Sequence, residues 1–440
     1  MLYRKLKADY LFTGEQLLPG DMVLITTDEG VVQDVVPAAE AGDDTEVFSG
    51  ILTPGFVNCH CHLELSHMKG VLPQRTGLVD FLTAVIKQRG NPVAGVGGSG
   101  SSAGSGSSAG SGTDADREKA MAEAEQEMLD GGIVAVGDIC NTADTLLLKT
   151  EGRLFYHNFI ETMGFIEQTA GQRFAQSLGV FTTFAEGYAL PIEANSIVPH
   201  APYSVSPVLF RLVTAFPGNH ILTIHNQESE EENEFYVTGK GDLLRLYQQL
   251  GLDVSFFKGT GRRSLESYLP AFYRNQHLIL VHNVATREED VLAAKMWAAG
   301  GGAADPAGGP AGSGGDPAGT PEGPAGGPTL FYCLCPNANE YISGRLPDVE
   351  MLVRNECRIV LGTDSLASNH QLSILEEMKT LQRAFPRRSI AELLRWATYN
   401  GAKALQLDGV LGSFEKGKQP GVVLLDHPYD LQHATVRRLL

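Results

Sequence analysis

The run TPGFVNCHCH at residues 53–62 is the stretch that decides the fold of this 440-residue chain. After the Pro-Gly pair, apolar residues lead to a strand-like end that places His60 and His62 two positions apart. Alternate side chains of a strand share a face, so both imidazoles point the same way, about 7 Å apart along the strand and within reach of one metal ion. Cys59 and Cys61 point the other way. The run indicates either a pair of metal ligands or two hydrogen-bonded histidines, and the other strands decide between them.

The composition is that of an acidic globular protein. Hydrophobic residues make up 43% of the chain, and 34 basic against 52 acidic residues give a net charge of -18. Such a charge argues against nucleic acid or an anionic membrane as a partner. No apolar stretch reaches the ~20 residues that span a bilayer, no signal segment opens the chain, and the six cysteines lack disulfide-framework spacing. We expect a cytoplasmic protein with reduced thiols.

Two low-complexity segments interrupt the chain. Residues 94–113 are almost wholly Gly, Ser and Ala, and residues 299–328 are Gly, Pro and Ala with a few acids. Neither can bury enough apolar surface to offset the entropy of ordering it. We interpret both as flexible insertions, with no function that the sequence assigns.

The remaining sequence alternates short apolar runs with stretches of helical periodicity. The apolar runs are Gly55–His62, Ile133–Cys140, Leu154–Ile160, Ser196–His200, Ile221–His225, Leu278–His282, Leu330–Cys335 and Arg358–Asp364. The helical stretches include Leu78–Arg89, Asp116–Asp130, Pro207–Ala215, Arg287–Ala298, Leu346–Asn355, Leu372–Ala384 and Ser389–Ala404. Eight buried strands alternating with helices is the count for an α/β fold of the (β/α)₈ TIM-barrel type. A doubly wound sheet is the alternative, but the Gly-rich phosphate loop that usually opens one does not follow the first run.

The two ends of the chain read differently from its middle. Residues 1–53 and 408–440 contain short strands and turns, too short to be stable alone. We expect them to pair into one small composite β domain, with residues 54–407 forming the metal-dependent barrel.

Polar residues close five of the apolar runs, and catalytic groups of a barrel lie at the carboxyl ends of its strands. The five closing residues are His62, His200, His225, His282 and Asp364. Imidazoles together with a carboxylate suit Zn²⁺ or Fe²⁺, which accept nitrogen and oxygen ligands. His220 and His277 lie at strand starts, on the opposite face, and we assign them structural roles.

This set of residues resembles the amidohydrolase superfamily, and within it the single-metal aminohydrolase branch of adenosine-type, guanine and triazine hydrolases. The matching motifs are PGFVNCHCH (54–62), PHAPYS (199–204), HNQE (225–228), HNV (282–284), CPN (335–337) with Asn339, LGTDSLASN (361–369) and GSFEKGK (412–418). The resemblance spans nearly the whole chain apart from the two insertions. The binuclear members carry a lysine at the end of the fourth strand, and Asn195–Ser204 contains none. The resemblance therefore implies one metal ion.

The resemblance also implies roles for individual residues. The metal ligands would be His60, His62, His225 and Asp364, holding one divalent ion, with Zn²⁺ as our first choice and Fe²⁺ as the alternative. Asp364 and His282 would orient a metal-bound water and accept its proton, while Glu228 would protonate the ring nitrogen of the substrate. His200 and Ser365 would bind substrate. Glu64 would either contact substrate or support the metal site.

An acidic run begins at Glu228, and four further glutamates follow it at positions 230, 231, 232 and 234. We expect those four to form a solvated helix face. Only the His-x-x-Glu spacing from His225 distinguishes Glu228 from them.

The implied function is hydrolytic deamination. A metal-bound hydroxide would replace the exocyclic amine of an adenine-like nucleoside and release ammonia. Aminodeoxyfutalosine is the first substrate choice, with adenosine-homocysteine and methylthioadenosine next. The alternatives are a triazine- or guanine-type aminohydrolase or chlorohydrolase, and a catalytically silent binding protein on the same fold. The expected partner is a small-molecule substrate, and the family implies a homodimer.

Overall fold

A computed structural model describes residues 3–88, 114–187, 194–300, 329–427 and 430–440. The expected insertion at 94–113 lies outside the described residues. So does the expected insertion at 299–328, apart from its first two residues.

Eight parallel strands form two four-stranded sheets. The first has the order β11-β10-β9-β8 and the second the order β12-β13-β14-β15. Their bounds are β8 Phe56–Cys61, β9 Ile133–Cys140, β10 Phe155–Thr162, β11 Asn195–Pro199, β12 Ile221–Asn226, β13 His277–His282, β14 Leu330–Leu334 and β15 Arg358–Leu361. Each predicted apolar run coincides with one of these strands, although several ends differ by one to three residues. Nearly every strand residue is buried, as parallel sheets covered on both faces require.

The two sheets approach each other at both outer edges without forming one continuous ring. At one junction the N–H groups of Thr363 and Asp364 both donate to the carbonyl of His60 at 3.0 Å. At the other, the N–H of His225 donates to the carbonyl of His200 at 2.9 Å. In the described part of the chain neither junction extends into a strand-to-strand ladder. The α/β architecture is therefore observed, whereas the closed eight-stranded barrel is not.

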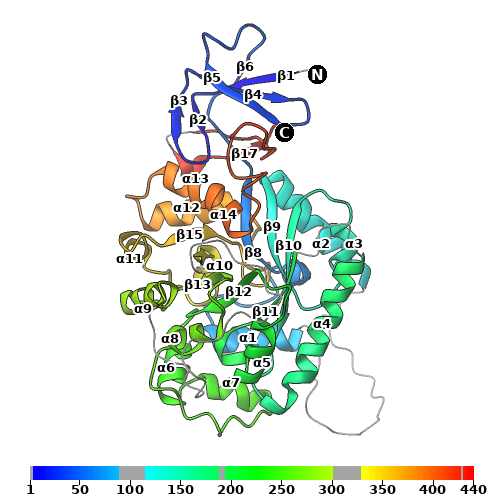
Figure 1. Cartoon of the computed structure of the whole chain (residues 1–440), viewed down its shortest axis with the longest axis vertical. Helices are drawn as coiled ribbons and strands as arrows, with labels where there is room; N and C mark the ends of the chain where they lie inside the picture. The colour runs from blue at the N-terminus through cyan, green and yellow to red at the C-terminus, as the bar shows by residue number, and fades with distance from the viewer. Residues whose placement is uncertain (1–2, 89–113, 188–193, 301–328, 428–429) are drawn as a thin grey trace.

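Helices connect the strands and lie around the outside of the two sheets (Figure 1). Their bounds are α1 Leu78–Gln88, α2 Asp114–Asp130, α3 Leu146–Lys149, α4 Ala170–Gly187, α5 Pro207–Thr214, α6 Glu230–Thr238, α7 Leu243–Gln249, α8 Ser264–Tyr268, α9 Glu288–Ala298, α10 Pro336–Ile342, α11 Val349–Arg354, α12 Ile374–Ala384, α13 Ile390–Ala397 and α14 Tyr399–Ala404. The expected single helix over Ser389–Ala404 is two helices, broken at Thr398. None of the described helices is long and apolar enough to cross a membrane.

Two more sheets are built from the ends of the chain. One is four-stranded, with the order β5-β4-β1-β6, and the other is five-stranded, with the order β17-β16-β7-β2-β3. Their bounds are β1 Tyr3–Lys7, β2 Tyr10–Phe12, β3 Leu17–Pro19, β4 Met22–Thr27, β5 Val32–Pro37, β6 Glu46–Val47, β7 Ile51–Thr53, β16 Val423–Leu425 and β17 Val436–Arg438. Strands from both ends pair in the five-stranded sheet, where Leu424 lies opposite Leu52.

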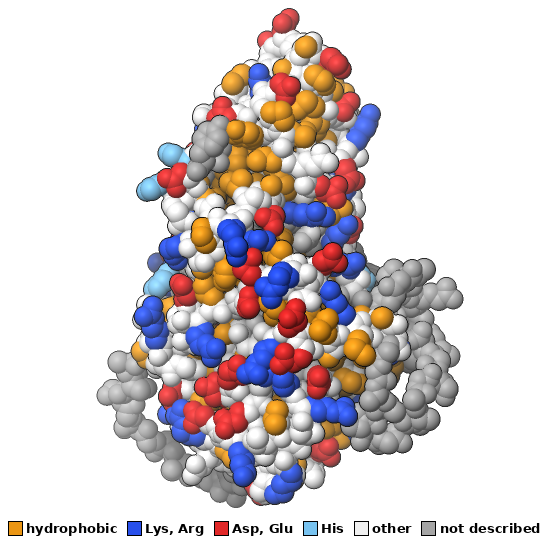
Figure 2. Space-filling view, turned by 90° about the vertical axis from the view of Figure 1, so that its left-hand side faces the viewer, with side chains coloured by type: hydrophobic (Ala, Val, Ile, Leu, Met, Phe, Trp, Pro, Cys, Tyr) orange, Lys and Arg blue, Asp and Glu red, His pale blue; other side chains and the backbone are white. Residues whose placement is uncertain are grey.

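The surface in Figure 2 differs between the two ends of the molecule. Hydrophobic side chains gather in the upper part, over the strands of the chain ends, whereas acidic and basic side chains are interspersed below. On this face the negative net charge is therefore not concentrated into one patch.

Candidate active site

Four side chains converge where the parallel strands end. The Nε2 atoms of His60 and His62 lie 3.2 Å apart. Asp364 Oδ1 lies 3.6 Å from the first and 3.3 Å from the second. Together with His225, all four residues offer ligand atoms within 4.8 Å of one another. His60 lies on β8 and His62 directly follows it, and both imidazoles face this point.

The donor set fits a divalent cation. The Nδ1 atoms of His60 and His62 are buried without a hydrogen-bond partner in the described residues, and their Nε2 atoms are the ones that face each other and Asp364. His225 Nδ1 lies 2.7 Å from the carbonyl oxygen of His200, which can only accept a hydrogen bond. Nδ1 therefore carries the proton, and Nε2 of His225 keeps a lone pair for a metal ion.

The protonation states also suit metal binding, which requires neutral imidazoles and an ionised carboxylate. Burial lowers the pKa of His60 to about 4. Burial alone would raise the pKa of Asp364, but the hydrogen bond from His60 and the nearby imidazoles outweigh it and hold the pKa below its ordinary value. The second oxygen of Asp364 accepts a hydrogen bond from Ser368 Oγ at 2.6 Å.

Non-glycine residues with left-handed backbone gather at these strand ends. Gln227 has φ 45°, His282 φ 74°, Asn283 φ 60° and Asp364 φ 56°. Such conformations cost on the order of 1–3 kcal/mol each and persist where the surroundings hold them. The side-chain amide of Asn283, for example, donates to the carbonyls of Leu280 at 2.8 Å and Cys333 at 3.1 Å.

Glu228 and His282 form a second pair beside the four ligand atoms. His282 Nε2 lies 3.7 Å from Glu228 Oε1. On its other side, His282 Nδ1 lies 2.9 Å from Asn339 Oδ1, an acceptor that leaves the proton on Nδ1 and a lone pair on Nε2. Burial raises the pKa of Glu228 to about 7. A carboxyl group that can hold a proton near neutrality thus lies next to an imidazole that can accept one.

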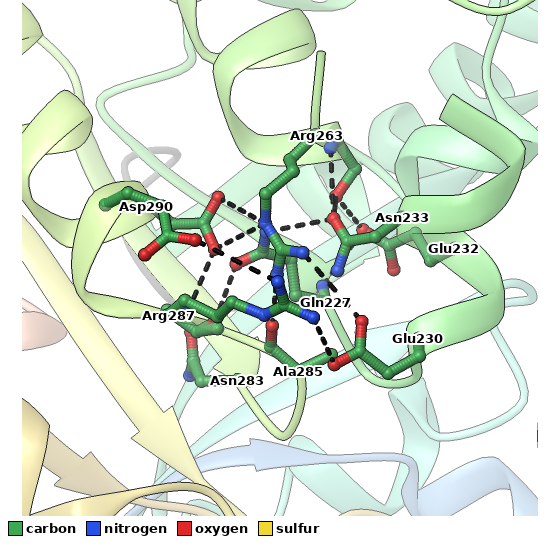
Figure 3. A network of polar contacts seen from close by, with 12 residues as sticks. Gln227, Glu230, Glu232, Asn233, Arg263, Asn283, Ala285, Arg287 and Asp290 are labelled. Atoms are coloured by element: carbon green, nitrogen blue, oxygen red, sulfur yellow. Dashed lines mark hydrogen bonds and ion pairs between the residues drawn. The ribbon is translucent and has the colours of Figure 1, made fainter. Parts of the chain in front are cut away.

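The segment that carries Glu228 is held by a network of polar contacts (Figure 3). The N–H of Gln227 donates to Glu232 Oε1 at 3.0 Å, and its side-chain amide donates to Asn233 Oδ1 at 3.1 Å. The same side chain accepts from Thr286 Oγ1 at 2.7 Å, and its carbonyl accepts from the N–H of Ala285 at 2.8 Å. Gln227 is therefore bound through its backbone and both ends of its amide.

Glu232 corrects one expectation from the sequence. It was expected on a solvated face, but its side chain is fully buried and accepts from Ser264 Oγ as well as from Gln227. The exposed face of α6 is formed instead by residues such as Glu234. An acidic run does not reveal which of its members the helix turns inward.

A cavity of about 200 Å³ opens onto these groups. Its polar lining residues include His62, His225, His282, Glu228 and Asp364. Its apolar lining residues include Leu65, Phe81, Leu82, Val85, Ile86, Phe165, Leu246, Leu250 and Leu252. The hydroxyl of Tyr203, another lining residue, is buried without a hydrogen-bond partner in the described residues.

The predicted substrate-binding residues divide into two groups. His200 and Ser365 line the cavity, and His200 Nδ1 lies 2.7 Å from Ser204 Oγ. Glu64 is not among the lining residues. Its Oε2 accepts from the N–H groups of Asn141 at 3.0 Å and Thr142 at 3.1 Å. This geometry favours the supporting role for Glu64 over substrate contact.

Glu161 is a cavity residue that the sequence analysis missed. It lies near the end of β10, and its Oε2 accepts from Asn141 Nδ2 at 2.9 Å. With His200 and His225 it forms a second group of possible ligand atoms within 4.8 Å. Burial acts to raise its pKa, but His200, His225 and His62 outweigh burial and bring the pKa to about 2. Its position directly after the third apolar run was the signal that could have found it.

Comparison with known proteins identifies the family and the fold of this chain. The model of the amidohydrolase family matches residues 51–437. An aminodeoxyfutalosine deaminase of Nitratiruptor sp. is 23% identical over 413 residues, which cover 92% of this chain and 85% of the relative. An adenosine deaminase of Helicobacter pylori is 25% identical over 376 residues, covering 84% and 78%. The crystal structure of Helicobacter pylori aminofutalosine deaminase in complex with methylthio-coformycin matches with a TM-score of 0.73 at 19% identity, over 99% of this chain and 100% of that one.

Proposed function

This chain belongs to the amidohydrolase family, and from that premise we propose that it removes the exocyclic amine of an adenine-like nucleoside and releases ammonia. Its deaminase relatives make it a hydrolase of C–N bonds. The single observation that carries the finer proposal is the position of Glu228 and His282. Glu228 Oε1 lies 3.7 Å from His282 Nε2. Both residues line the cavity that is also lined by His62, His225 and Asp364.

The proposed ligands of one divalent ion are His60, His62, His225 and Asp364. Zn²⁺ is our first choice, and Fe²⁺ would use the same nitrogen and oxygen donors. When bound, such an ion supplies Lewis acidity, which lowers the pKa of water and stabilises negative charge that develops during the reaction.

The proton transfers are assigned to residues of the chain. Protonated Glu228 donates to a ring nitrogen of the substrate, which makes the neighbouring carbon more electrophilic. His282 Nε2 and Asp364 accept the proton of the attacking water. Asn339 orients His282 for this role because it engages the opposite ring nitrogen. Glu228 then relays the proton taken from the water to the departing amine, and the second proton of the water returns Glu228 to its acid form as ammonia leaves.

The cavity supports a nucleoside with an apolar substituent. Its polar lining residues suit a heteroaromatic ring, and its apolar lining residues, such as Phe81, Leu246 and Leu250, suit a less polar part of the substrate. Aminodeoxyfutalosine, methylthioadenosine and adenosine-homocysteine all carry a substituent at the 5′ position of the sugar. His200 and Ser365 are the proposed substrate contacts.

The finer structural assignments remain part of this proposal. Residues 54–407 would work as one (β/α)₈ barrel, and residues 1–53 with 408–440 as a composite β domain. A homodimer and a cytoplasmic location stay predictions from the sequence.

The test is ammonia release by metal-loaded protein with aminodeoxyfutalosine, adenosine-homocysteine, methylthioadenosine, adenosine, guanine and a chloro-triazine. Turnover of an adenine nucleoside supports the proposal and ranks the 5′ substituents. Chloride release from the triazine, or ammonia from guanine alone, would replace it with the corresponding alternative. Silence with one metal ion bound per chain would contradict the proposed substrate class.

A further inference from the structure

We propose that Glu377 is a positioning residue for proton transfer. It lies outside the cavity and holds the segment that orients His282 against the turn that bears Asp364. These are the two residues assigned to accept the proton of the attacking water. The inference rests on the proposed deaminase function and adds to it a residue that acts from behind the site.

Glu377 is a buried acid of α12 to which the proton transfers above assign no role. Its side chain is fully buried, and it is not among the residues that line the cavity. A buried carboxyl group is costly unless its oxygens are hydrogen-bonded. Both oxygens of Glu377 accept a hydrogen bond, and the two donors come from two different segments that follow strands. The donors therefore show what this acid holds together.

The first donor belongs to the segment that orients His282. The N–H of Asn337 donates to Glu377 Oε2 at 2.9 Å. Asn337 lies in the first turn of α10, two residues before Asn339, whose Oδ1 lies 2.9 Å from His282 Nδ1. Thr380, one turn after Glu377, donates from its hydroxyl to Asn337 Oδ1 at 2.5 Å. Helix α12 thus fixes the start of the short helix from which Asn339 reaches His282.

The second donor belongs to the turn that bears Asp364. Asn369 Nδ2 donates to Glu377 Oε1 at 2.8 Å and to the carbonyl oxygen of Thr363 at 2.9 Å. Thr363 directly precedes Asp364, whose backbone is left-handed with φ 56°. Such a conformation persists only where its surroundings hold it. The bond from Asn369 to Thr363 is one such support, and Glu377 holds Asn369 in place for it.

This bridge requires the two oxygens of a carboxyl group. Each oxygen of Glu377 accepts from an N–H donor, one on each segment. A glutamine has only one oxygen, and its NH2 group would face a donor instead of an acceptor. E377Q therefore breaks one arm of the bridge while it keeps the size of the side chain. Because the bridge joins two segments, its loss should change the position of His282 relative to Asp364.

The experiment measures kcat and KM for adenosine and methylthioadenosine in the metal-loaded wild type and in Glu377→Gln. We expect E377Q to lower kcat by about 10- to 100-fold, the usual loss when a residue that supports a metal ligand is removed. KM should stay close to the wild-type value, since Glu377 does not line the cavity. A loss of kcat at constant KM distinguishes misplaced proton acceptors from a damaged binding cavity.

Glu125→Gln is the matched control. Glu125 is equally buried on a helix, but it accepts from the hydroxyl of Tyr156 at 2.8 Å and does not line the cavity. Tyr156 lies near the start of β10, away from the strand ends where the proposed ligands converge. E125Q should therefore lower the melting temperature without changing kcat, whereas E377Q should lower both.

Two more measurements separate the two arms of the bridge. In an Asn339→Leu background, where His282 has already lost its acceptor, E377Q should cost less than the product of the two separate losses in kcat. In the Co²⁺-loaded protein, E377Q should shift the visible absorption bands, because Asp364 is a proposed ligand. N339L and E125Q should leave those bands unchanged.

Thr380→Val tests the first arm without changing a carboxyl group, so it carries the test if E377Q does not fold. It removes only the hydroxyl that donates to Asn337. It should lower kcat by roughly 2- to 13-fold at constant KM, the equivalent of one neutral hydrogen bond. If E377Q does not fold and T380V keeps the wild-type kcat, the inference is overturned.

Each contrary result has a distinct meaning. If E377Q keeps the wild-type kcat, or raises KM alone, the inference fails while the deaminase function stands. Equal losses of kcat in E377Q and E125Q also overturn it, because they report general destabilisation. If the wild type releases no ammonia from any nucleoside, the proposed function fails, and the inference fails with it.

Discussion

The backbone N–H of Leu63 donates a 2.9 Å hydrogen bond to the carboxylate of Asp138, so β9 holds the chain directly after His62. The other oxygen of Asp138 lies 2.5 Å from Lys149 Nζ, and both side chains are fully buried. Lys149 also donates to Asn158 Oδ1 at 2.6 Å. Burial alone would lower the pKa of Lys149, but Asp138 outweighs burial and keeps the pKa above its ordinary value. A charged pair in the interior thus supports the loop beside the proposed metal site.

Lys149→Met should destabilise the protein by about 3–5 kcal/mol, because it leaves the charge of Asp138 buried without its partner. Urea unfolding measures the loss. Lys119→Met is the matched control, since Lys119 is exposed and, among the described residues, forms an ion pair only with Glu123 one turn away. A cost below about 1 kcal/mol for K149M, the range of an exposed pair, would contradict this account.

Glu228→Gln should lower kcat by about 10²–10⁴-fold, the usual contribution of a general acid, and should leave one metal ion bound. Ammonia release and metal analysis of the same sample test both points. Glu234→Gln changes an exposed acid of α6, the helix that follows Glu228, and should behave like the wild type. Persistent turnover in E228Q would show that the proton donor is misassigned.

Removal of the metal ion should lower the melting temperature, since an ion bound to the folded state alone stabilises it by about 2.7 kcal/mol at 100 times its Kd. Thermal unfolding with a chelator and after addition of Zn²⁺ measures this difference. Asp364→Asn removes a charged ligand and should lose the response to Zn²⁺. A wild type that unfolds at the same temperature with and without metal would argue against a bound ion at this site.

Tyr203→Phe should reduce kcat/KM by roughly 2- to 13-fold, the equivalent of one neutral hydrogen bond, if the Tyr203 hydroxyl, which has no partner in the described residues, bonds substrate in the cavity that this residue lines. The melting temperature should not fall, because no described residue loses a hydrogen bond from that hydroxyl. Tyr236→Phe provides the contrast. Its hydroxyl donates to the carbonyl of Pro202 at 2.9 Å, so that variant should lose stability instead. Unchanged kinetics in Y203F would assign the hydroxyl no part in catalysis.

Glu232→Gln should weaken the dependence of stability on pH. Burial raises the pKa of Glu232 from 4.5 to about 8, so in the window between these values the folded state holds a proton that the unfolded state releases. Stability from this group is present below the lower value and falls as the pH rises toward the higher one. Glutamine does not titrate, and its oxygen can still accept from Gln227. Melting temperatures from pH 5 to pH 8 should therefore decline less in E232Q than in the wild type, and an equal decline would contradict the assignment.

The proposed ligands were predictable because they lie at or near the ends of apolar runs. His62, His225 and Asp364 close such runs, His60 lies two residues before the end of the first, and parallel strands bring their carboxyl ends to one place. Glu161 follows the same rule and was missed only because the third run appeared to end at Ile160. Their roles as ligands and contacts stay predictions until measured.

Other features depend on tertiary contacts that periodicity does not report. The burial of Glu232 follows from Ser264 and Gln227, which lie on other elements. The contact of Glu64 with Asn141 depends on the loop after β9. Likewise, alternation of strands and helices predicts eight parallel strands, but not whether their ladders close at His200 and His225 or at His60 and Asp364.

A ribosome releases β2, β3 and β7 long before it makes β16 and β17, the strands that complete their five-stranded sheet. During most of synthesis the edge of β7 that contains Leu52 therefore lacks its partner strand β16, which contains Leu424. The parallel strands β8 to β15 mostly pair with neighbours in sequence and can assemble in the order in which they emerge. All four proposed ligands, the last of them Asp364, leave the ribosome before β16. A metal ion can thus join the nascent protein while its two ends are still apart.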